Sequence, residues 1–171
     1  MSLRSLSWPS GLDVKEVVDR EFVVEAARGD VWPRLLDVHA VASWLPIMHS
    51  VTEVSPGADS IDGSSFQAAF EDKVGPFSLR ADLHIEVAGV REPEEVSIRA
   101  RGEDRQIRSR IMIDAAARLS DAGPGQTRVQ LVGSYEITGR VATLGAGIIR
   151  SKAAKLIDTF CTNAAAGLSG T

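Results

Sequence analysis

The residues that could carry acid–base or metal chemistry are few in this chain. Its three histidines, His39, His49 and His84, lack metal-ligand spacing such as i, i+4 on one helix. The one cysteine, Cys161, excludes an internal disulfide and a zinc site built from several thiolates. No serine stands in a nucleophile elbow, and residues 139–147 lack the Lys-Ser/Thr ending of a phosphate-binding loop. We therefore expect no metal, no cofactor and no catalytic residue.

Tyr135, the single tyrosine, is the polar residue that stands out. The alternation around it places its side chain on the inward face of a strand, beside Gly133. A buried phenol needs a hydrogen-bond partner, which a ligand oxygen, a backbone group or water could supply. Arg20 shares the inward parity of Phe22 and Val24, and it points either toward the mouth of the interior or into solvent at the sheet end.

The elements that must position these groups begin with a strand and two short helices. Residues 14–26 alternate at their end and predict the strand. Apolar residues 31–36 have helical spacing, and Asp30 is the expected N-cap of that helix. A second short helix is predicted over residues 38–45, and Pro46 ends it.

Residues 51–137 change to a period of two, which is typical of strands with one face in the core. Turn signals such as Gly75-Pro76 and Glu92-Pro93 cut this stretch into about six strands. The connections are short enough for antiparallel hairpins.

Residues 141–166 predict one long C-terminal helix. Its first part, residues 141–149, has no charge and contains Gly145 and Gly147, so we expect it to be buried nearly all round. The pattern indicates an α+β helix-grip fold: a curved antiparallel sheet wrapped around the long helix, with two short helices after the first strand. We expect a lead-in over residues 1–12, one domain over residues 13–166 and a tail over residues 167–171.

Many inward positions of the predicted strands are alanine or glycine, and they would face a helix half of similarly small residues. Small residues on both surfaces mean either unusually close packing or a hollow, because interiors normally pack to a density near 0.75. A curved sheet cannot approach the helix everywhere, so we expect an apolar cavity between them. The predicted ligand-binding residues are Trp44, Phe66, Phe70, Leu83, Ala100, Ile113, Tyr135, Leu144, Gly147 and Ile148. Trp44 could be a core plug or a lid.

Length, charge and hydropathy exclude several classes. The 171 residues, 18.3 kDa, suit one domain. The net charge of -4 argues against binding to nucleic acid. No apolar run reaches the roughly 20 residues of a membrane span, and residues 1–12 do not resemble a signal peptide, so we expect a cytoplasmic protein. Basic residues spread around the last helix favour a solvated face, with at most peripheral membrane contact.

Several motifs resemble known families. The opening resembles the START-related (SRPBCC) superfamily through Phe22-x-Val24-x-Ala26, Val31-Trp32 and Leu45-Pro46. The chain more narrowly resembles the CoxG family of carbon monoxide dehydrogenase subunits through Lys73-Val74-Gly75-Pro76, Tyr135 with Gly139, and residues 139–145 leading to residues 154–160. This resemblance implies a helix-grip fold with a hydrophobic cavity, binding of a lipid or quinone-like molecule, and an accessory role for a molybdenum hydroxylase of the carbon monoxide dehydrogenase type.

Three functions remain open at this point. The first is a carrier or binding protein for a hydrophobic small molecule. The second is an enzyme of the polyketide cyclase/dehydratase type using the same cavity, with Tyr135 and either Arg20 or Asp72 as acid–base groups. The third is an interaction module that assists a larger enzyme.

Overall fold

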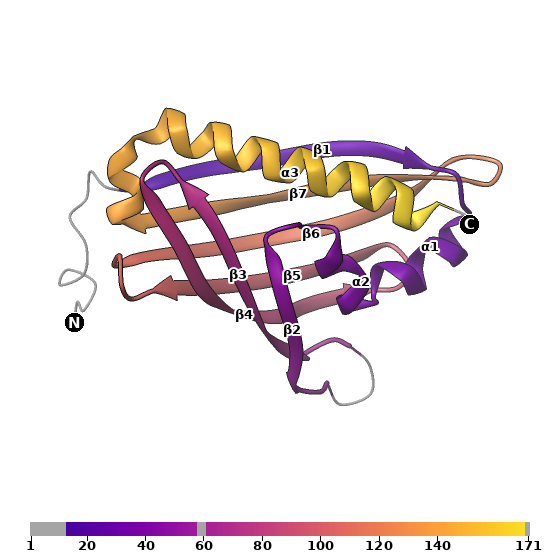
Figure 1. Ribbon diagram of the computed structural model, residues 1–171. Helices are drawn as coiled ribbons and strands as arrows, with labels where there is room; N and C mark the ends of the chain where they lie inside the picture. Colours follow the sequence, from indigo (N-terminus) through magenta and orange to yellow (C-terminus); the bar gives the residue numbers. More distant parts are fainter. Residues whose placement is uncertain (1–12, 58–60, 170–171) are drawn as a thin grey trace, which may run out of the picture.

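One antiparallel sheet curves around a long helix in the computed structural model, which describes residues 13–57 and 61–169 (Figure 1). The predicted lead-in over residues 1–12 and the end of the predicted tail, residues 170–171, lie outside the described residues. Within the described part, seven strands form one sheet in the order β1-β7-β6-β5-β4-β3-β2. The strands are β1 (Val14–Val24), β2 (Met48–Ser55), β3 (Ser65–Val74), β4 (Phe77–Arg91), β5 (Glu95–Asp104), β6 (Ser109–Gly123) and β7 (Gln126–Gly139).

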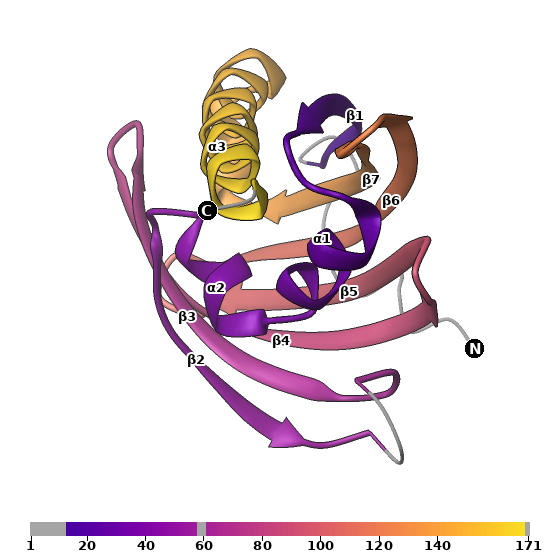
Figure 2. The same ribbon diagram turned by 90° about the vertical axis from the view of Figure 1, so that its right-hand side faces the viewer.

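The helices lie inside the curve of this sheet, as the view in Figure 2 shows. The short helices α1 (Arg28–Leu35) and α2 (Val38–Ser43) follow β1, and the 3-10 helix η2 (Arg140–Leu144) and α3 (Ala146–Leu168) follow β7. This arrangement confirms the predicted helix-grip fold. The six strands predicted from the period of two are β2 to β7, joined in sequence as antiparallel neighbours.

The final helix begins later than the apolar pattern predicts. After η2, Gly145 adopts a φ of 98°, a left-handed conformation that only glycine adopts without strain, and α3 starts beyond it. The expectation that this uncharged stretch is buried nearly all round is therefore wrong for its second part. Val141 is buried, whereas Gly147 is exposed and Ile148 keeps 51% of its surface exposed.

The start of α1 also differs from the prediction, because its N-cap is Ala27 and not Asp30. The carbonyl oxygen of Ala27 accepts hydrogen bonds from the backbone N–H groups of Asp30 and Val31, at 2.9 and 3.0 Å. The first turn is thus already closed when the chain reaches Asp30. The carboxylate of Asp30 then lies in that first turn, where a negative charge is favourable to the helix dipole.

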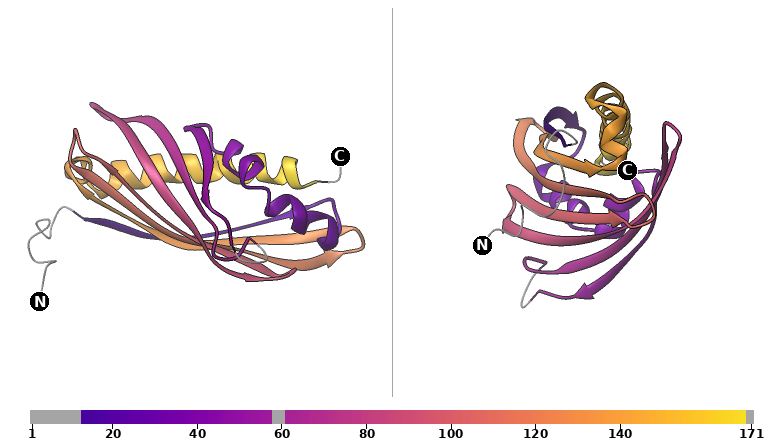
Figure 3. Two further views of the ribbon diagram at one scale, coloured as in Figure 1. Left: turned by 90° about the horizontal axis from the view of Figure 1, so that it is seen from below. Right: turned by 90° about the vertical axis from the view of Figure 1, so that its left-hand side faces the viewer.

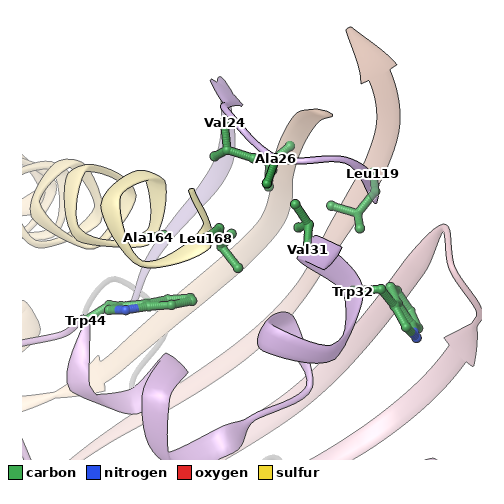
Figure 4. Packing of buried hydrophobic residues seen from close by; sticks show 9 residues of the cluster. Val24, Ala26, Val31, Trp32, Trp44, Leu119, Ala164 and Leu168 are labelled. Atoms are coloured by element: carbon green, nitrogen blue, oxygen red, sulfur yellow. The ribbon is translucent and has the colours of Figure 1, made fainter. Parts of the chain in front are cut away.

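A buried apolar cluster joins α1 and α2 to the last turns of α3 (Figure 4). The ring of Trp44 meets that of Phe160 edge-on, with centroids 5.9 Å apart. The backbone carbonyl oxygen of Trp44 accepts a hydrogen bond from Nδ2 of Asn163 at 3.0 Å. Leu168, the last residue of α3, is fully buried in the same cluster. Trp44 packs here as a core residue.

Two ion pairs hold α3 along β1. Nε of Arg20 lies 3.0 Å from Oδ1 of Asp158, and Arg150, about two turns earlier on the helix, pairs with Glu16. Both partners on β1 stand at inward-pointing positions, because Glu16 and Arg20 share the parity of the buried Val14 and Val24. The main contacts of α3 with the sheet are accordingly made along β1.

Candidate functional site

The strand register aligns inward-pointing residues in rows across the sheet. One row runs from β1 to β3 through the register pairs Glu16–Tyr135, Tyr135–Ile113, Ile113–Ala100, Ala100–Ile85 and Ile85–Phe66. Four of the predicted ligand-binding residues belong to this row, namely Phe66, Ala100, Ile113 and Tyr135. Alternation within each strand predicted only that these residues share one side of the sheet. The strand register shows that they also lie next to one another.

The neighbouring row is built from smaller residues, in the pairs Val18–Gly133, Gly133–Ala115 and Ala115–Ile98. Gly133 is required by close approach of the strands, because a Cβ at this position would lie 2.1 Å from the carbonyl oxygen of Asp114. The middle of the sheet thus carries little side-chain bulk beneath the helix. We call the residues of these two rows the concave face.

Phe66 and Ala100 of the concave face are buried, but other apolar side chains of this face remain only half-buried although they point toward α3. Ile98, Ile113 and Ala115 all keep part of their surface accessible. The helix does not cover them because it runs along β1, at one side of the curve (Figure 1). An inward apolar surface that still meets solvent favours an apolar ligand, since its burial is worth about 25 cal/mol per Å².

Tyr135 supplies a polar group at one end of this face. Its side chain is half-buried, and no other described residue forms a hydrogen bond with its hydroxyl. Burial raises the pKa of the Tyr135 phenol, and the negative charge of Glu16 raises it further, against an opposing effect of Arg150. The phenol is therefore protonated at neutral pH and is available to donate a hydrogen bond to a ligand oxygen.

Glu16 is a residue of this region that the sequence reasoning did not single out. The available signal was its position in β1, which has the same parity as the inward Phe22 and Val24. Its carboxylate lies next to Tyr135 in the register and pairs with Arg150 of α3. We call Glu16, Tyr135 and Arg150 the polar corner, because β1, β7 and α3 meet there.

Three further predicted ligand-binding residues are packed in the core. Phe70 and Leu83 are buried in one apolar cluster on β3 and β4, on the same side of the sheet as the concave face. Trp44 is buried in the cluster under the end of α3. Close packing leaves these three side chains with little accessible surface, in contrast to Ile113 and Tyr135.

The remaining three predicted residues lie where α3 begins. Leu144 packs against the β3–β4 turn, with its Cδ1 3.2 Å from where a Cβ on Gly75 would stand. Gly147 and Ile148 belong to a pocket of about 310 Å³ between that turn and the first turns of α3. The pocket is lined by Lys73, Val74, Gly75, Gly147, Ile148, Ser151, Lys152 and Lys155. The predicted set is therefore divided between the concave face, the core and this pocket.

The groups considered as acid–base partners of Tyr135 both form ion pairs with α3. Arg20 pairs with Asp158, and Oδ1 of Asp72 lies 3.0 Å from Nζ of Lys152. These ion pairs engage Arg20 and Asp72 with residues of α3, and neither side chain forms a hydrogen bond with the Tyr135 hydroxyl. Among the described residues there is no group of three histidine, cysteine or acidic side chains that could hold a metal ion. In the same part of the chain, no helix is long and apolar enough to cross a membrane.

Comparison with known families matches residues 21–169 to the family described as the carbon monoxide dehydrogenase subunit CoxG. The match covers all of the elements from the end of β1 to the end of α3. No curated protein matches the sequence.

Solved structures share the fold at low sequence identity. A conserved protein from Geobacillus kaustophilus is similar with a TM-score of 0.73 and 17% identity, over 90% of this chain and 95% of that one. A START superfamily protein from Mycobacterium smegmatis gives a TM-score of 0.66 and 13% identity, over 89% and 96%. A truncated norcoclaurine synthase from Thalictrum flavum gives 0.56 and 13%, over 86% and 92%. At these identities the likeness establishes the fold.

Proposed function

Because the chain belongs to the CoxG family of carbon monoxide dehydrogenase subunits, we propose that it binds a hydrophobic small molecule, a lipid or a quinone-like compound, on its concave face. One observation carries this proposal: Ile98, Ile113 and Ala115 point toward α3 and remain accessible. A domain of this size normally buries such residues against the opposing layer. A bound apolar molecule would complete the layer that α3 leaves open.

The polar corner gives the proposed ligand an orientation. The Tyr135 hydroxyl has no partner among the described residues and donates a hydrogen bond to an oxygen of the ligand. The apolar body then lies over Gly133 and Ala115, where the sheet carries the least bulk. The ligand class is therefore an apolar body with at least one oxygen acceptor at one end, a description that fits both a quinone and a lipid.

The direct test is native mass spectrometry of the gently purified protein, combined with organic extraction of any bound molecule. A panel of quinones and phospholipids is then added to the extracted protein, with water-soluble analogues that lack the apolar tail as controls. The proposal expects one-to-one complexes with tailed compounds and none with the short analogues. Absence of any bound or bindable tailed compound overturns it.

An accessory role for a molybdenum hydroxylase of the carbon monoxide dehydrogenase type is the finer part of the proposal, and the family description supports it. Copurification of the tagged chain from its native source tests this part. Recovery of such an enzyme at stoichiometric yield is the expected result. Recovery of the chain with its apolar ligand and without that enzyme rejects the partnership and leaves ligand binding intact.

An enzymatic function of the polyketide cyclase/dehydratase type is the second candidate, and the proximity of Tyr135 and Glu16 favours it. A protonated phenol beside a carboxylate can serve as an acid–base pair. The discriminating measurement is the mass of the ligand recovered after incubation with the protein. A carrier returns the ligand unchanged, whereas an enzyme of this class returns a cyclised or dehydrated product, and Glu16→Gln abolishes that product.

A further inference from the structure

Lysine is unevenly distributed in this protein. The chain contains four lysines, at positions 15, 73, 152 and 155, and the last three all line the pocket between the β3–β4 turn and α3. The other positive charges are arginines, and most of these are paired with acidic residues, as in Arg99–Asp114 and Arg128–Glu21. Three of the four lysine side chains, whose ammonium groups are compact and strongly hydrated, therefore line one pocket.

The two sides of the pocket are held in a defined geometry. On α3 the lining residues Ile148, Ser151, Lys152 and Lys155 follow the i, i+3, i+4, i+7 spacing of a single helix face. The β3–β4 turn stands beside the first part of α3 in the right panel of Figure 3, and residues of that turn line the pocket opposite this helix face. The volume of the pocket, about 310 Å³, is within the lower range of small-ligand pockets.

The charge of the pocket is opposite to that of the whole chain. Lys152 is neutralised by Asp72, but neither Lys73 nor Lys155 has an acidic partner within the described residues. Two uncompensated ammonium groups therefore face one concavity on a chain whose net charge is -4. An anion is the complementary ligand for such a site.

An apolar side chain stands among these lysines. Ile148 lines the pocket and keeps 51% of its surface exposed. A soluble anion gives an exposed isoleucine no apolar partner, whereas the interface of a lipid bilayer offers both an anionic headgroup and acyl chains. The combination of free lysines and an exposed isoleucine favours the bilayer.

We propose that this pocket binds the phosphate-bearing headgroup of an anionic phospholipid and docks the protein on a membrane surface, with Ile148 at the acyl boundary. Lys73 and Lys155 contact the phosphate, and the Lys152–Asp72 pair holds the two walls together. This docking function stands apart from ligand binding on the concave face, because the pocket lies at the β3–β4 turn and shares none of the residues of the two rows.

Vesicle cosedimentation tests the proposal, with large vesicles of phosphatidylcholine alone or mixed equally with phosphatidylglycerol. The wild type is expected to bind the anionic vesicles, to bind less as salt is raised, and to leave neutral vesicles unbound. Each lysine near an anionic surface contributes about fivefold in affinity, so Lys73→Gln with Lys155→Gln should weaken binding by about 25-fold. Ile148→Ser should weaken it severalfold.

Charge-matched controls separate the pocket from overall charge. Lys15→Gln with Arg101→Gln removes two cations from exposed outward positions on β1 and β5, and Val54→Ser removes an exposed valine from β2. These variants should retain vesicle affinity within about twofold, and circular dichroism establishes that every variant is folded. Equal losses in pocket and control variants overturn the proposal.

Inorganic phosphate distinguishes a membrane headgroup from a free anion. If millimolar phosphate saturates the pocket in a calorimetric titration while anionic vesicles do not sediment the protein, the site serves a soluble anion and the docking proposal is wrong. The tailed-ligand complexes seen in native mass spectrometry should survive in the double lysine variant. Loss of vesicle binding with ligand binding retained therefore supports docking through the pocket, whereas vesicle binding that persists in the double lysine variant overturns it.

Discussion

Nζ of Lys152 on α3 lies 3.0 Å from Oδ1 of Asp72 on β3, and this ion pair ties the tip of the β3–β4 hairpin to the helix. Arg20 and Glu16 hold the same helix from β1, at the other end of the curved sheet. The helix is thus fastened at both margins of the curve while Ile113 and Ala115 beneath it remain accessible. A helix held at its margins can stay in place above an open apolar surface.

Removal of the Asp72 charge should destabilise the protein. Its side chain is 13% exposed and that of Lys152 is 36% exposed, so the ion pair is partly screened by water, and Asp72→Asn leaves the Lys152 ammonium unpaired. We expect a loss of about 1–2 kcal/mol in the free energy of unfolding, measured by urea denaturation. Asp114→Asn is the matched control, because Asp114 and Arg99 are 61% and 60% exposed and such pairs contribute less than about 1 kcal/mol. Equal losses in the two variants would show that Asp72 contributes no more than a surface charge.

Two glycines of α3 should respond to alanine in opposite directions. A Cβ on Gly167 would stand 2.6 Å from Nε1 of Trp44, whereas a Cβ on Gly147 meets nothing within 4 Å. Gly167→Ala should therefore cost about 1–3 kcal/mol because Trp44 must move. Gly147→Ala should gain up to about 1 kcal/mol from helix propensity. Thermal unfolding measures both, and a stabilising Gly167→Ala would contradict the packing of Trp44 on α3.

The fold follows from periodicity that is visible in the sequence. Strands β2 to β7 lie where the apolar residues alternate, and the turns lie at signals such as Gly75-Pro76. Boundaries that depend on single backbone conformations were harder to predict. The break between η2 and α3 rests on the φ of 98° at Gly145, and an apolar stretch with two glycines is compatible with either a continuous or a broken helix.

Alkaline pH should destabilise the protein through Tyr135. Burial and Glu16 raise the pKa of this phenol above its ordinary value of 10.0. Above that pH the unfolded chain loses the proton while the folded chain keeps it, so the unfolded state binds fewer protons and stability falls as pH rises. Because Tyr135 is the only tyrosine, phenolate absorbance reports its titration alone.

Tyr135→Phe is the companion variant for that titration. It should lose the alkaline step in stability and remain nearly as stable as the wild type at neutral pH, because the hydroxyl has no partner among the described residues. Its affinity for the proposed ligand should fall by about 2- to 12-fold, the worth of one hydrogen bond. An unchanged affinity of Tyr135→Phe for the ligand would show that the Tyr135 hydroxyl does not contact the ligand. It would not affect the predicted titration of Tyr135.

Cys161 should react slowly with thiol reagents in the folded protein. Burial raises the pKa of the Cys161 thiol, and Asp158 adds to the effect while Arg20 opposes it. Less thiolate is therefore present at pH 8 than in an unfolded chain, and the thiolate is the reactive form. Alkylation followed by mass spectrometry should be slower for the native protein than in urea. Equal rates would mean that α3 exposes this thiol freely.

The sequence predicts which residues of the candidate site face inward, but it does not predict how α3 lies relative to them. Alternation assigned Tyr135, Ile113, Ala100 and Phe66 to the inward side, and the register then joined them in one row. The sequence could not show that Gly147 lies at a lysine-lined pocket, because that depends on how α3 tilts between β1 and the β3–β4 hairpin. Glu16 was not predicted as a site residue, although it shares the inward parity of Phe22 and Val24 in β1.

Filling the concave face tests the central claim most directly. Ala115→Phe places a ring over the small-residue row, and Ala116→Phe places the same ring on the opposite side of β6. Titration of both folded variants with the tailed ligand identified in the wild type gives the decisive comparison. We expect Ala115→Phe to lower the affinity at least about tenfold, the effect of blocking a well-packed apolar contact, and Ala116→Phe to retain it. Unchanged binding by Ala115→Phe would contradict a ligand site on the concave face.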